Sequence, residues 1–233
     1  MKMHILSGGA AQGAVRALAP KFEAETGYEI AGSFGAVGAM KEKLLAGEPA
    51  DFVILTRKLI DELAASGTIE PDTCADLGRV RTGVAVKERE PIPDVSDADG
   101  LRAALLAADS VYFPDPQRAT AGIHFAKVID ALGVRGEISE RLRPYPNGAT
   151  AMREMAKAPE ARPLGCTQIT EILYTPGVAL VAPLPAEFEL ATVYTAGVCR
   201  DAAAPEAARR FVALLTGENS RELRKQAGFE LPA

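Results

Sequence analysis

The sequence has no tryptophan, and aromatic residues make up only 6% of it. Flat stacking platforms for nucleic-acid bases or sugar rings are therefore not expected. It also has no excess of basic residues, since the formal net charge is −5 and the estimated pI is about 5.3. These totals do not indicate a nucleic-acid-binding surface, although they leave room for a local basic pocket.

Cysteine and histidine are also scarce. The three cysteines, Cys74, Cys166 and Cys199, are widely spaced and odd in number, which fits neither a disulfide framework nor a metal-ligand spacing. The two histidines are too few for a histidine-rich metal site. We therefore expect neither a metal nor a cofactor.

No apolar run approaches the roughly 20 residues that a membrane-spanning helix needs. The N-terminus reads "MKMHILSGGA" and enters a strand-like segment without the apolar core and cleavage site of a signal peptide. We therefore expect a cytoplasmic protein, or a periplasmic one if a native signal peptide has been removed. An ABC permease is expected as a partner only if the chain is exported.

The pattern that is present is an alternation of strands and helices. Strand-like residues 3–7, 28–34 and 51–56 alternate with helical spacing, and "DFVILT" is a continuous apolar run typical of a strand buried on both faces. A similar alternation follows from residue 101, through the strand-like "SVYFPD" and "PLGCTQ". The pattern predicts an α/β fold whose mainly parallel sheets are covered by helices.

In such sheets, ligands bind beyond the carboxyl ends of the strands, where loops enter helices. The turns at these places combine small residues with hydroxyl or amide groups, and helix N-termini favour negative charge. This combination predicts a cradle for a small anion, with Arg118 suited to pairing with a carboxylate. The predicted ligand-binding residues are Ser7, Gly8, Gly9, Ala36, Val37, Arg118, Thr120, Ala121, Asn147, Thr150, Thr167 and Gln168.

Catalytic candidates are fewer. His124 lies in the apolar run "IHFAKVIDAL", where a structural histidine is the commoner case, and Glu171 would by default lie on a helix surface. Either is a candidate general base if its side chain faces the ligand. Cys166 is expected to be a small buried residue rather than a nucleophile.

The chain also resembles a known family. The run "GEPADFVI" after the turn "FGAVG", together with "ILSGGAAQGAVRALAPKFEAETGYEI" and "FPDPQRATAGIHFAKVIDALGV", is similar to the molybdate-binding proteins of ABC transporters. The resemblance implies a type II periplasmic-binding-protein fold, with two lobes joined by two hinge crossovers and a ligand in the interlobe cleft. It places lobe I at residues 1–81 and 195–233 and lobe II at residues 82–194.

Two functions stay open at this point. The resemblance favours binding of a small oxyanion or organic carboxylate, with Ser7 matching the family's first-turn serine and Val37 standing where the family turn "GASG" has a hydroxyl. The alternative comes from aconitate isomerase-like variants of the same fold, and implies a cytoplasmic isomerase that shifts a proton and a double bond in a di- or tricarboxylate. A ligand sensor is a third reading, for which the sequence reveals no partner surface.

Overall fold

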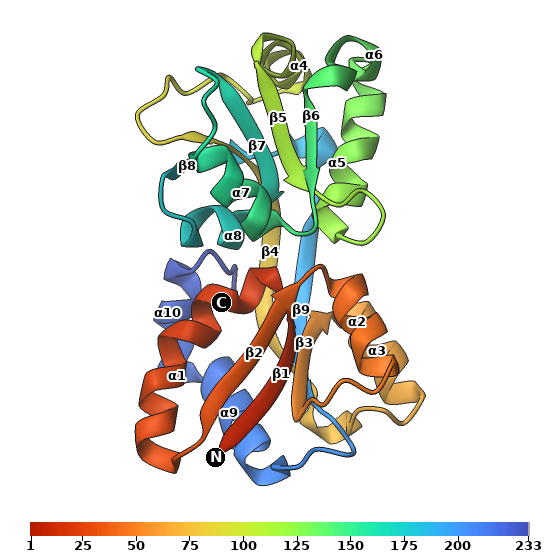
Figure 1. The fold of residues 1–233 in the computed structure, drawn as a ribbon, viewed down its shortest axis with the longest axis vertical. Helices are drawn as coiled ribbons and strands as arrows, with labels where there is room; N and C mark the ends of the chain where they lie inside the picture. The colour runs from red at the N-terminus through yellow and green to blue at the C-terminus, as the bar shows by residue number, and fades with distance from the viewer. Residues whose placement is uncertain (233) are drawn as a thin grey trace. The chain divides into compact units, whose positions relative to one another are not determined.

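The computed structural model describes residues 1–232 and divides the chain into two compact units. Unit 1 contains residues 1–80 and 192–232, and unit 2 contains residues 81–191. The strands β4 (Ala75–Lys87) and β9 (Ala191–Val198) carry the chain from one unit into the other. Figure 1 shows the course of the chain through both units.

Unit 1 is built on three parallel strands. β1 pairs with both β2 and β3 in parallel register, and β3 pairs with β9 in antiparallel register. β3 has the sequence "FVILT", and its apolar side chains are buried on both faces, as the continuous run predicts. The other elements of this unit are β1 (Lys2–Gly8), α1 (Gln12–Thr26), β2 (Glu29–Gly35), α2 (Val37–Leu45), β3 (Phe52–Thr56), α3 (Arg57–Ala65), α9 (Pro205–Thr216) and α10 (Arg221–Gln226).

The two sequence segments of unit 1 share one core. Phe211 of α9 lies 5.0 Å from the ring of Phe22 on α1 and 5.6 Å from the ring of Phe52 on β3. Gly27 ends α1 in the left-handed conformation, with φ of 73°, which a glycine adopts without steric cost. The C-terminal helices therefore complete the core that the N-terminal strands begin.

Unit 2 has the strand order β4-β7-β5-β6, and β8 pairs with β4. β5 is parallel to β6 and β7, whereas β4 runs antiparallel to β7 and β8. The α/β fold covered by helices is thus confirmed, as a mixed sheet with parallel strands at the centre of each unit. The elements of unit 2 are α4 (Ala98–Ala107), β5 (Ser110–Pro114), α5 (Thr120–Ala131), α6 (Arg135–Ile138), β6 (Leu142–Tyr145), α7 (Gly148–Ala156), β7 (Pro163–Gln168), α8 (Ile169–Tyr174) and β8 (Val178–Pro183).

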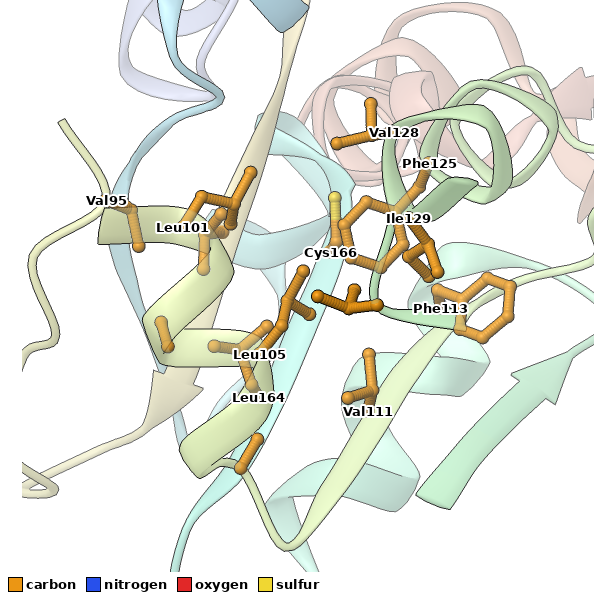
Figure 2. Close-up of a cluster of buried hydrophobic side chains, with 14 of the residues drawn as sticks. Val95, Leu101, Leu105, Val111, Phe113, Phe125, Val128, Ile129, Leu164 and Cys166 are labelled. Carbon is orange, nitrogen blue, oxygen red and sulfur yellow. The ribbon is translucent and has the colours of Figure 1, made fainter. Parts of the chain in front are cut away.

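The sheet of unit 2 has a core on each face. On the first face, which we call the α5 face, strand residues Val111, Phe113 and Cys166 pack against α4 and α5 (Figure 2). On the opposite face, the α7 face, Tyr112 packs against α7 and α8. Alternate residues of one strand point to opposite faces, so each strand position can be assigned to a face.

None of the helices within residues 1–232 is long and apolar enough to cross a membrane.

Candidate functional site

The predicted turn residues of unit 1 lie together at one edge of its sheet. The parallel register sets Gly8 opposite Gly35 and Ser7 opposite Ile54, so β1, β2 and β3 end side by side. Gly9 opens the short turn before α1, and Ala36 directly precedes α2. The Ser7 hydroxyl is fully buried and donates to the carbonyl oxygen of Gly8 over 2.9 Å.

The side chains of Val37 and Tyr194 lie beside Gly8 at this edge. A side-chain carbon added to Gly8 would lie 2.8 Å from Val37 Cγ1 and 3.1 Å from the ring of Tyr194, so both groups flank the glycine. Tyr194 was not among the predicted residues. It comes near the turn because β9 pairs with β3, with Tyr194 opposite Thr56, and only the strand pairing reveals this.

In unit 2, a second group of predicted residues lies at the start of α5, on the α5 face. Ala119 precedes the helix and supplies no capping side chain, and Thr120 and Ala121 form the first turn. Asp115 Oδ1 accepts from the backbone N–H groups of Gln117 and Arg118, which fixes the loop before the helix.

Gly122 explains how closely this first turn approaches the strand. A Cβ on Gly122 would overlap the carbonyl oxygens of Pro114 and Asp115, so only glycine fits where α5 crosses the end of β5. The first-turn N–H groups therefore lie at the carboxyl edge of the sheet, where helix dipoles favour an anion.

Gln168 and Thr82 lie on the same face and at the same edge. They are directly opposite each other in the antiparallel pairing of β4 and β7, so their side chains share a face. Both residues are buried, yet within residues 1–232 their side-chain oxygen and nitrogen atoms have no hydrogen-bond partner. Gln168 was predicted from the sequence, whereas Thr82 was missed.

His124 lies on α5, one turn beyond Thr120, and is half-buried. Its Nε2 lies 2.8 Å from the carbonyl oxygen of Phe188. A carbonyl only accepts, so Nε2 carries the hydrogen, and Nδ1 holds the lone pair when the ring is neutral. His124 therefore has a structural partner on one side of the ring and a basic nitrogen on the other.

The remaining predicted residues gather on the α7 face. Asn147 Oδ1 accepts from the N–H of Thr150 and so caps α7. Thr167 Oγ1 donates to Glu171 over 2.6 Å, and the backbone N–H of Ala149 also donates to this carboxylate.

The default surface position of Glu171 is wrong, because its side chain is buried. Burial raises the pKa of the Glu171 carboxyl above its ordinary value, while the hydrogen bonds from Thr167 and from two backbone N–H groups act in the opposite direction. The sequence could not show this, because the first turn of a short helix is more often exposed.

Within the described part of the chain, no three histidine, cysteine or acidic side chains cluster as metal ligands. Cys166 is fully buried, as expected, and burial raises the pKa of its thiol well above the ordinary value.

The structure thus brings the predicted residues together in three groups. The first group is in unit 1 and the other two occupy opposite faces of unit 2.

A family model described as a bacterial extracellular solute-binding protein matches residues 3–230. The chain belongs to this family.

Similarity to individual members of known function is more distant. A curated aconitate isomerase from Pseudomonas sp. is 28% identical over 97% of this chain and 86% of its own length. The periplasmic molybdate-binding protein of Azotobacter vinelandii has a TM-score of 0.80 at 19% identity, over 99% of this chain and 100% of that one. The sulfate-binding protein SubI of Mycobacterium tuberculosis has a TM-score of 0.75 at 19% identity, over 98% of this chain and 86% of that one.

These comparisons confirm the resemblance to the molybdate-binding-like, type II periplasmic-binding-protein fold. Because the solved neighbours share under a quarter of their residues with this solute-binding protein, they establish its fold alone. The roles of the grouped residues stay predictions.

Proposed function

We propose that this solute-binding protein binds a small organic acid and takes one of its carboxylates at the start of α5. The observation that carries the proposal is the uncapped first turn of α5 next to Arg118. Backbone N–H groups at a helix start and a neighbouring guanidinium are the donors that suit a carboxylate.

The contrast with other helices of unit 2 supports this assignment. The starts of α4 and α7 already hold side-chain oxygens, because Asp97 accepts from Gly100 and Asn147 accepts from Thr150. Glu171 also accepts from Ala149 at the start of α7. The first turn of α5 is therefore better suited than that of α7 to receive a charge from outside the protein.

The proposal is tested by calorimetric titration with molybdate, tungstate, sulfate and a panel of di- and tricarboxylates. We expect carboxylates to bind, and Arg118→Ala to weaken them by about 1.5–3 kcal/mol, or roughly 10- to 150-fold. Arg102→Ala is the matched control, since Arg102 is an exposed arginine of α4 that pairs with Glu137, and should change affinity little. A response to molybdate and tungstate alone would refute the organic-acid proposal, and unchanged affinity in Arg118→Ala would remove Arg118 from the site.

The similarity to an aconitate isomerase favours a second candidate, an isomerase of a di- or tricarboxylate. Such a reaction removes a proton from one carbon, moves the double bond, and returns a proton to another carbon, so it needs no oxidant. His124 Nδ1 and the Glu171 carboxyl are the candidate bases. Incubation with aconitate in deuterium oxide, followed by NMR, tests this: deuterium incorporation and a shifted double bond support isomerisation, and an unchanged spectrum at high protein concentration excludes it.

The cellular location decides the partner. We propose a cytoplasmic protein without a permease, which fractionation of the native host with an antibody against this chain would test. Recovery outside the cytoplasm would instead point to delivery of the ligand to an ABC permease.

A further inference from the structure

The unpartnered polar atoms of Gln168 and Thr82 restrict the chemistry of the ligand. Gln168 is 3% exposed and Thr82 is 1% exposed. Among residues 1–232, neither Gln168 Nε2, nor Gln168 Oε1, nor Thr82 Oγ1 has a hydrogen-bond partner. Buried side chains of this kind are normally satisfied, so three adjacent exceptions indicate a missing partner.

The backbone holds these two side chains against each other. The Thr82 N–H donates to the backbone carbonyl oxygen of Leu190, and the Thr82 carbonyl accepts from the backbone N–H of Leu184. Both backbone groups of Thr82 therefore point away from β7. Thr82 and Gln168 therefore form a non-hydrogen-bonded pair, in which opposing Cα atoms lie about 4.5 Å apart and the side chains are closest.

The pair also lies beside the proposed carboxylate position. β5 and β7 are parallel with Tyr112 opposite Gly165, and extending this register sets Asp115 level with Gln168. Gly122 of α5 packs directly on the carbonyl of Asp115. The first turn of α5 and the amide of Gln168 are thus neighbours on one face of unit 2.

A partner that supplies both a donor and an acceptor can satisfy all three atoms. Gln168 Nε2 needs an acceptor, Gln168 Oε1 needs a donor, and the Thr82 hydroxyl can serve as either. An inorganic oxyanion or an ionised carboxylate offers acceptors only, and itself supplies no donor to Gln168 Oε1. A hydroxyl group next to a carboxylate offers both kinds of atom within one small ligand.

We propose that Gln168 and Thr82 recognise a hydroxyl group on the ligand, so that the preferred ligand is a hydroxy acid. The ligand hydroxyl donates to Gln168 Oε1, while the Gln168 amide and the Thr82 hydroxyl donate to oxygens of the same ligand. This inference rests on the proposed binding of a carboxylate at the start of α5. It predicts that aconitate, which has no hydroxyl, binds more weakly than a hydroxylated tricarboxylate.

The test uses pairs of acids that differ by one hydroxyl: malate against succinate, and citrate against tricarballylate. In the wild-type protein we expect at least one hydroxylated member to bind about tenfold or more tightly than its partner, because a site built to bond a hydroxyl rejects the analogue that lacks it. Thr82→Val and Gln168→Met should bring this ratio towards one. Thr82→Ser keeps the hydroxyl and should retain the preference.

Gln226→Met is the matched control, because Gln226 is exposed on α10 in unit 1. If no acid binds, the proposed carboxylate function fails. If acids bind but the wild-type ratio is one, or if Thr82→Val and Gln168→Met leave the ratio unchanged, the hydroxyl inference alone fails and buried water satisfies these side chains. Melting curves of each variant separate lost folding from lost selectivity, and Gln168→Met remains decisive if Thr82→Val does not fold.

Discussion

Gly148 and Glu171 show how a single atom decides the geometry of one site group. The Glu171 carboxylate and the Thr167 hydroxyl lie so close to Gly148 that a Cβ on this residue would overlap both. The glycine is therefore required by close approach, since no positive φ is involved at this position.

We predict that Gly148→Ala destabilises the protein by about 2–4 kcal/mol, because overpacking adds to the displaced hydrogen bond between Thr167 and Glu171. Gly136→Ala is the matched control: Gly136 lies in the short helix α6, and outside its chain neighbours and its own helix no atom of residues 1–232 lies within 4 Å of its missing Cβ. This substitution should change stability by less than about 1 kcal/mol. Urea unfolding of both variants measures the difference. Equal stabilities would show that the carboxylate moves aside at little cost.

For single residues, the sequence predicts which ones lie at the end of a strand better than it predicts which residues they contact. The turn rule selected Gln168 because it follows a strand, but Thr82 lies in the middle of "GRVRTGVAVKE" and carries no turn signal. Only the register of β4 against β7 makes the two neighbours. The predicted surface position of Glu171 was also wrong because of a tertiary contact: its burial depends on α7 packing over α8.

Among the elements, those with strong periodicity were predictable, whereas the short edge strand β6 was not. "DFVILT" and the helix that contains His124 follow directly from apolar spacing. β6 has the sequence "LRPY", whose arginine and proline resemble a loop; it forms a strand because β5 offers it a parallel edge. Such pairing is a tertiary effect that local propensity does not contain.

The contact between α8 and α7 gives a pH-dependent prediction. Burial raises the pKa of Glu171 above its ordinary value of 4.5, so the folded state binds the proton more tightly than the unfolded state. The contribution of this group to stability is then fully present below that ordinary value and is lost as the pH rises through the folded pKa. Relative to Glu171→Gln, the wild-type protein should therefore lose unfolding free energy as the pH increases from 4.5.

Urea unfolding of both proteins at several pH values measures this difference, so that titrations common to the two proteins cancel. Glu154→Gln is the matched control, since Glu154 is a half-buried residue of α7 that pairs with the exposed Lys157. A difference between wild type and Glu171→Gln that does not vary with pH would contradict the raised pKa.

On the scale of the whole molecule, the two units differ in how the chain builds them. Unit 1 needs two distant segments, because Phe211 packs on Phe22 and Phe52 across more than half of the sequence. Unit 2 is one continuous segment, residues 81–191, and both of its hydrophobic cores lie entirely within it.

We therefore predict that a fragment of residues 81–191 folds alone, whereas residues 1–80 do not. The first keeps every core contact around Phe125 and Met152, and the second loses the aromatic packing of Phe211. Circular dichroism should show a cooperative melt for the first fragment and none for the second. Adding residues 192–233 as a separate peptide should restore structure to residues 1–80. If neither the fragment 81–191 nor this mixture folds, the strands β4 and β9, which run from one unit into the other, must be intact for either unit to form.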